Sequence, residues 1–155
     1  MEIRQAELDD IEGCVAALAL LPEFFTPSTH DEVRTSMIID RAVVAVDGAT
    51  VLGFVLNQER HPRSAEIIYA AVHPGSDAKG LGRWSCVAYS PIWAPPASRE
   101  WKLRRSMSQR DTNHFVATRR FWESHGFIQV DCIDPLPGWE PGNPAAIYVK
   151  ALTDT

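Results

Sequence analysis

The sequence has few cysteines, no long apolar run and no targeting segment. The three cysteines, Cys14, Cys86 and Cys132, include no CxxC pair, so we expect free thiols in a reducing compartment. The longest apolar run, residues 15–21, is far too short to cross a bilayer. The first ten residues are acidic and lack the regions of a signal peptide. These absences predict a cytoplasmic protein with no membrane partner.

The sequence also lacks an excess of basic residues. Its net charge of −5 argues against nucleic-acid binding, which usually needs a basic patch. The same charge is compatible with a cationic substrate, although surface carboxylates are the simpler explanation, because net charge mainly governs solubility. No metal-ligand spacing joins His30, His61, His114 and His125. We therefore predict no metal and no nucleic-acid partner.

The chain has the size and composition of one globular domain. Its 155 residues, 45% hydrophobic and 23% charged, are typical of a soluble protein. A chain of this length buries a core without disulfides or a metal. It contains no internal repeat, low-complexity tract or linker. We expect a single domain covering residues 1–155.

Hydrophobic periodicity predicts alternating strands and helices. The clearest signal is the Asp47-Gly48 turn between two β-rich runs, which is typical of a hairpin. Asp31 and Glu32 fall in the first turn of a helix that Ser28 or Thr29 can cap, where negative charge is favourable. The elements expected first are strand 2–6, a helix from about residue 8 to before Pro22, helix 28–39, hairpin 42–57 and strand 67–72. Those expected later are helix 83–90, strand 103–108, helix 113–125, strand 128–130 and strand 146–152. This order predicts one α/β domain with a mixed sheet.

The chain is organised around residues 66–83, EIIYAAVHPGSDAKGLGR. An apolar strand, a glycine loop and a helix N-terminus together form a place for a phosphate group. A nucleotide P-loop is excluded, because Leu81 and Gly82 replace its lysine and hydroxyl residue. A dinucleotide fingerprint is weak, because Ser85 stands at the third glycine position and an antiparallel hairpin precedes the loop.

Two sequence blocks resemble the GCN5-related N-acetyltransferase (GNAT) family. The V-x-P at residues 72–74, a five-residue spacer and Gly80-x-Gly82 are similar to that family's coenzyme A loop. The second block is similar to its N…A…F-Y…G-F motif and consists of Asn113, Ala117, Phe121, Trp122, Gly126 and Phe127. Both blocks occur in order at the right separation, and the resemblance covers essentially the whole chain.

The resemblance implies an α/β (α+β) fold: a mixed, mostly antiparallel sheet with a splayed parallel strand pair and helices on both faces. It also implies acetyl-CoA as cosubstrate, with the backbone near Ala71 and Val72 pairing with the pantetheine amides and Asn113 contacting the pantetheine arm. The pyrophosphate would be held by the amides of Lys79, Gly80, Leu81, Gly82 and Arg83.

The activity implied is direct transfer of acetyl from acetyl-CoA to a primary amine of a small molecule or peptide, through a tetrahedral intermediate. The attacking amine must be neutral, so the site needs a base. Glu66 stands where many family members carry an acidic residue, although a solvent-exposed carboxylate at a strand end explains it equally well; Tyr69 or His73 could do the same work. Phe24 and Phe25 fall where the family builds its acceptor pocket, or else pack beneath their loop.

Two residues depart from the family pattern. Asp77 stands where an arginine or glutamine is usual, and its carboxylate repels a pyrophosphate unless it is paired. Trp122 stands where a tyrosine often acts as general acid, and an indole has no proton to give. Trp122 is then a core residue, and Tyr148 and Ser124 are the candidate acids. These departures leave a second possibility, a non-catalytic acyl-CoA-binding sensor or interaction module on the same fold. The sequence is also compatible with a homodimer.

Overall fold

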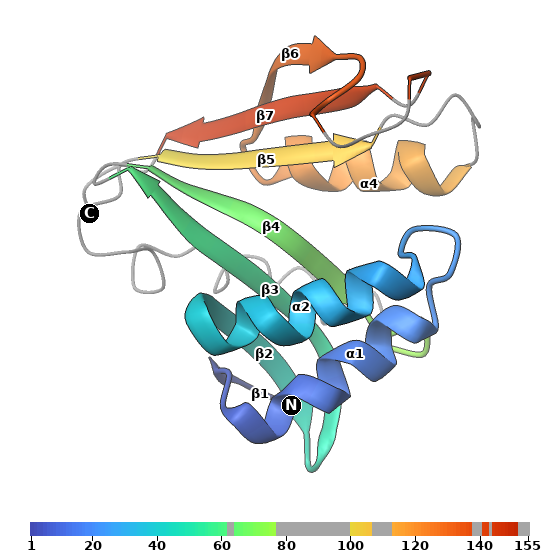
Figure 1. Ribbon diagram of the computed structural model, residues 1–155, viewed down its shortest axis with the longest axis vertical. Helices are drawn as coiled ribbons and strands as arrows, with labels where there is room; N and C mark the ends of the chain where they lie inside the picture. The colour runs from blue at the N-terminus through green and yellow to red at the C-terminus, as the bar shows by residue number, and fades with distance from the viewer. Residues whose placement is uncertain (62–63, 77–99, 107–112, 138–140, 143, 152–155) are drawn as a thin grey trace.

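The computed structural model describes residues 1–61, 64–76, 100–106, 113–137, 141–142 and 144–151 (Figure 1). These residues form a seven-stranded sheet in the order β1-β2-β3-β4-β5-β7-β6. The strands are β1 Glu2–Gln5, β2 Arg41–Asp47, β3 Thr50–His61, β4 Ser64–Val72, β5 Glu100–Ser106, β6 Ile128–Ile133 and β7 Ala145–Ala151. Among these described strands, only β4 and β5 pair in parallel. The predicted mixed, mostly antiparallel sheet is confirmed.

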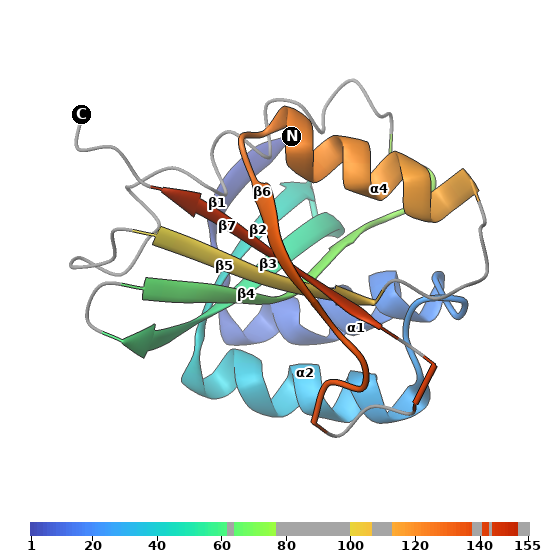
Figure 2. The same ribbon diagram turned by 90° about the horizontal axis from the view of Figure 1, so that it is seen from above.

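Helices cover both faces of the sheet, as predicted (Figures 1 and 2). Helices α1 (Ile11–Ala19) and α2 (Pro27–Ile39) lie on one face, and α4 (Asn113–Ser124) lies on the other. A 3-10 turn, Leu8–Asp10, precedes α1. Helix α2 begins at Pro27 rather than at Ser28 or Thr29, because the fixed φ of proline suits the first helical position. Among the described helices, none is long and apolar enough to cross a bilayer.

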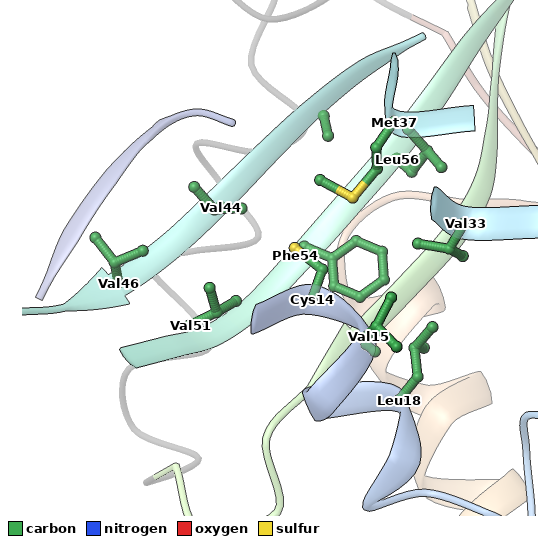
Figure 3. Packing of buried hydrophobic residues seen from close by; sticks show 12 residues of the cluster. Cys14, Val15, Leu18, Val33, Met37, Val44, Val46, Val51, Phe54 and Leu56 are labelled. Carbon is green, nitrogen blue, oxygen red and sulfur yellow. The ribbon is translucent and has the colours of Figure 1, made fainter. Parts of the chain in front are cut away.

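Apolar side chains from α1, α2 and the sheet form the larger core (Figure 3). Phe54 of β3 lies at its centre and is fully buried. The buried residues drawn around it are Cys14, Val15, Leu18, Val33, Met37, Val44, Val46, Val51 and Leu56. Burying each large side chain contributes about 1.5–3 kcal/mol. This core holds α1 and α2 against β2, β3 and β4.

A second core fills the space between the sheet and α4. Trp122 is buried there, and its ring meets those of Phe121 and Phe127 edge-on at centroid distances of 5.2 and 5.1 Å. Gly126 has a φ of +81°, and the Phe127 amide donates to the carbonyl of Trp122. Gly126 therefore ends this helix in a left-handed conformation, and the predicted core role of Trp122 is confirmed.

Two strands extend beyond their predicted ends. β3 runs to His61 rather than to residue 57, because it continues to pair with β4. β6 runs to Ile133, into a stretch predicted as loop, because Cys132 and Ile133 pair with Ala146 and Ala145 of β7. Cross-strand pairing determines both ends, and no local residue signals it.

We expect Asp10→Asn to destabilise the protein at neutral pH and to lose that effect in acid. The Asp10 carboxylate accepts two hydrogen bonds from Arg4, at 2.6 and 2.9 Å, and one from the Glu7 amide at 2.7 Å. The hydrogen bonds from Arg4 hold the pKa of Asp10 below its usual value. The stabilisation is therefore present above the unfolded-state pKa, near 3.9, and is lost as pH falls through the folded-state pKa.

The expected loss is about 1 kcal/mol, because solvent reaches Arg4 and weakens the pair. Urea unfolding of both proteins at neutral and acidic pH measures it. An equal difference at both pH values would contradict the assignment.

Candidate active site

Strands β4 and β5 separate part-way along their length. They pair from Ser64 with Glu100 to Ile67 with Leu103 and no further, although both strands continue. Figure 1 shows them meeting at their N-terminal ends and diverging toward their C-terminal ends. The predicted splayed pair is confirmed. Among the described residues, no strand pairs with the β5-facing edge of β4 beyond Ile67, so that edge can pair with an extended ligand.

A β-bulge lies where the strands separate. Tyr69 pairs with Leu56 and Ile67 pairs with Asn57, which leaves Ile68 as an extra residue in β4. A bulge bends its strand and increases the local twist. It also changes which face the side chains point to, because residues three apart in a regular strand face opposite sides. The extra residue brings Glu66 and Tyr69 to the same face.

Ala71 and Val72, which the resemblance placed against the pantetheine arm, lie on the diverging part of β4. Their other neighbour is β3, which approaches closely because Gly53 has no side chain. A Cβ atom on Gly53 would lie 2.9 Å from the carbonyl oxygen of Ala71. This part of β4 is therefore fixed on one edge by β3 and open on the other.

A pocket of about 680 Å³ lies on the α2 face beside the bulge. It is lined by Asp31, Glu32, Thr35 and Ser36 of α2, Gln58 and Arg60 of β3, Glu66, Ile67, Ile68 and Tyr69 of β4, and Leu136 and Pro137. Glu66 is only 5% exposed, and one of its oxygens accepts a hydrogen bond from Nε of Arg60 at 2.5 Å. The explanation of Glu66 as a solvent-exposed carboxylate is therefore wrong. It is a buried, paired carboxylate in the wall of a pocket.

Tyr69 and His73 are poor alternatives as bases. The Tyr69 hydroxyl donates to Glu32 at 2.5 Å, and burial together with this carboxylate raises the pKa of Tyr69. Its phenol therefore stays protonated at neutral pH. His73 accepts a hydrogen bond from the Gly75 amide at 3.0 Å through Nδ1. That bond holds the turn that follows β4.

Tyr148 lies at the level where β4 and β5 part. It pairs in register with Leu103, which is the last residue of β5 paired with β4. Its side chain is fully buried in the core on the α4 face, together with Ile67. Glu66 and Tyr148 thus lie on opposite faces of the sheet at the same opening. The Ser124 hydroxyl bonds instead to the Phe121 carbonyl at the end of α4.

The aromatic pair before α2 does not form the pocket. Phe25 packs against the core beneath α1 and α2, and neither Phe24 nor Phe25 is among the lining residues. Helix α2 supplies the wall in their place. The sequence does not reveal this wall, because Asp31 and Glu32 follow the start of a helix and the helix dipole already explains acidic residues there.

The remaining predicted residues belong to the predicted coenzyme A loop and to α4. Asn113 is the first residue of α4, which begins on the side where β4 and β5 are open (Figure 1). The loop residues Lys79, Gly80, Leu81, Gly82 and Arg83 lie outside the described residues, as does Asp77. In the part of the chain that is described, no three His, Cys, Asp or Glu side chains cluster as metal ligands would.

Solved structures with a similar fold include acetyltransferases. A GNAT-family protein from Desulfovibrio desulfuricans is 18% identical, with a TM-score of 0.80 over 97% of this chain and 98% of that chain. The aminoglycoside 6'-N-acetyltransferase from Enterococcus faecium is 19% identical, with a TM-score of 0.76 over 100% and 99% of the two chains. The chain has the GNAT fold.

A GNAT acetyltransferase from Elizabethkingia anophelis, solved with acetyl-CoA bound, is 13% identical, with a TM-score of 0.70 over 97% of both chains. No protein-family model matches the sequence, and no curated protein matches it. The GNAT fold of this chain is therefore established by its structure, over nearly its whole length.

Proposed function

We propose that this protein transfers an acetyl group from acetyl-CoA to a primary amine of a small molecule or peptide. One observation carries the proposal: the opening between β4 and β5 meets an acidic pocket at Glu66. An opening beside an unpaired strand edge suits an extended acyl carrier, and an acidic pocket suits an amine. Neighbours with the same fold include acetyltransferases that bind coenzyme A or acetyl-CoA and one that acts on aminoglycosides.

The residues of the opening fit coenzyme A. An extended arm can pair with the free edge of β4 at Ala71 and Val72 as an added strand would. We assign Asn113 to the same arm and the amides of residues 79–83 to the pyrophosphate, as the sequence motifs suggest. When bound, acetyl-CoA supplies an acetyl group activated as a thioester.

The protein's own residues then remove a proton from the amine and donate one to the leaving sulfur. Glu66 takes a proton from the incoming ammonium group, so that the nitrogen attacks as a neutral amine. Arg60 holds the carboxylate in place through its hydrogen bond. Tyr148, on the other face of the opening, is the proposed donor of a proton to the leaving sulfur.

Ligand binding and turnover test the proposal in two steps. A ligand bound only by the native state raises its stability, by about 2.7 kcal/mol at one hundred times Kd. We expect acetyl-CoA to raise the melting temperature and a panel of amines to release free thiol from it. No stabilisation by millimolar acetyl-CoA would refute both the enzyme and the acyl-CoA sensor. Binding without turnover would favour the sensor. The buried indole of Trp122 supports that alternative, because it cannot donate a proton as the family's tyrosine does.

We expect Tyr148→Phe to lower kcat by about tenfold, because a phenylalanine cannot donate a proton to the leaving sulfur. The effect is modest for a general acid, since a thiolate is a tolerable leaving group. Steady-state kinetics with saturating amine measure it, and the retained ring should leave KM for acetyl-CoA nearly unchanged. An unaltered kcat in a folded variant would mean that Tyr148 is a core residue and does not donate a proton to the sulfur.

A further inference from the structure

The carboxylates of the pocket differ in whether a cation compensates them. Glu66 is paired with Arg60. Asp31 is paired with Arg34 at 2.9 Å, and Glu12 shares the same guanidinium at 2.8 Å. Glu32 differs from both.

Glu32 accepts a hydrogen bond from a neutral donor, the Tyr69 hydroxyl. Within the described part of the chain, no lysine, arginine or histidine lies within ion-pair distance of it. Within these residues its charge is therefore not cancelled by a basic side chain, and an ammonium group of a bound ligand would cancel it.

The position of Glu32 separates it from the reacting centre. Glu32 is an exposed residue of α2, whereas Glu66 is buried in β4. Tyr69, whose hydroxyl bonds to Glu32, is three residues beyond Glu66 along β4. The bulge at Ile68 brings Tyr69, and with it the contact to Glu32, into the pocket that contains Glu66. The pocket thus has an inner and an outer carboxylate.

The same region carries a further negative charge. The Asp40 carboxylate accepts two hydrogen bonds from the side-chain amide of Gln58, at 3.2 and 3.1 Å, and Gln58 lines the pocket. An amide is neutral, so it orients this carboxylate without cancelling its charge. The surroundings of the pocket therefore favour a ligand with more than one positive charge.

The two carboxylates suit different nitrogen atoms of one ligand. Glu66, at the opening between β4 and β5, is placed to take the proton of the attacking nitrogen. Glu32, on α2, favours the protonated form of an ammonium group beside it, and that form cannot attack. A carboxylate far from the thioester cannot take the proton of the reacting nitrogen. It can bind a second nitrogen atom of the ligand that stays protonated throughout the reaction. Charge-assisted hydrogen bonds of this kind are the stronger ones in proteins.

We propose that the acceptor is a diamine-type substrate, whose reacting nitrogen lies at Glu66 and whose second ammonium group is bound by Glu32. This inference rests on the proposed acetyl transfer and specifies its substrate class. Tyr69 acts as a positioning residue, because its hydroxyl fixes the Glu32 carboxylate over the pocket.

Matched acceptors test the inference. Straight-chain diamines and monoamines of equal chain length differ only in the second ammonium group. We expect the diamines to have a KM about tenfold lower, and Glu32→Gln to remove that advantage while kcat for both series stays the same. Added salt should weaken the diamine preference of the natural protein, because the contact is partly exposed.

The control variant is Glu123→Gln, which removes the same charge from an exposed position on α4, on the other face of the sheet. It should keep the diamine preference. Equal KM values for the two series, or an equal effect of Glu32→Gln on both, would overturn the inference and leave acetyl transfer intact. Absence of turnover with every amine would instead refute the proposed function.

Discussion

Glu66→Gln is expected to lower kcat/KM at neutral pH by about a hundredfold or more, within the usual range for loss of a general base. Glutamine has nearly the same shape but cannot accept the proton of an ammonium group. The loss should shrink at high pH, because a growing fraction of the amine is already neutral. The pH dependence of kcat/KM for both proteins, measured with one acceptor, provides the test.

The variant should fold, so a loss of activity is interpretable. Its ion-pair partner Arg60 has a side chain that is 43% exposed, and it can therefore turn to water instead of remaining buried without a partner. The melting temperature serves as the control. An unchanged pH profile, or an equal loss at every pH, would remove Glu66 from the proton transfer.

Phe54→Ala is expected to lower the free energy of unfolding by about 3–5 kcal/mol, the range for truncating a fully buried phenylalanine. Phe54 is 0% exposed and lies between the two helices and the sheet (Figure 3). The backbones of three strands restrict how far the site can collapse, so most of the cavity should remain. A loss of this size is a large part of the stability of a small domain.

Urea unfolding of the variant and the natural protein measures this change. Ile39→Ala provides the matched control, because Ile39 is 76% exposed on the surface of α2, and its loss should stay within about 0.5 kcal/mol. A change below 1 kcal/mol for Phe54→Ala would mean that the helices repack freely on the sheet.

Local signals in the sequence predicted much of the fold. The Asp-Gly turn of the first hairpin and the glycine that ends α4 both adopt positive φ, at +58° for Gly48 and +81° for Gly126. These features depend on one or two residues and their own backbone. The splayed strand pair was predicted from the resemblance of the motif blocks, and not from the strands themselves.

The site was harder to predict, because its geometry depends on contacts between distant segments. Nothing in the pair Ile67-Ile68 signals a bulge, since both residues suit a regular strand equally well. The pairing of Arg60 with Glu66 needs two strands to meet, and the contact of Glu32 with Tyr69 joins residues 37 positions apart. Glu66 and Tyr69 are candidates that the sequence offers, but their surroundings came only from the tertiary structure.

The extra residue in β4 also makes the register of this strand against β3 important. Glu66 and Tyr69 are three residues apart, so they share a face only while Ile68 stays outside the pairing of β3 with β4. A slip of register that paired Ile68 regularly would turn the two side chains to opposite faces. Exchanging Ile68 for another strand-forming residue would keep the register and both orientations. The pocket therefore depends on the register of β4 against β3 as much as on the chemistry of its residues, and a shift of one residue in that register would be more damaging than most substitutions.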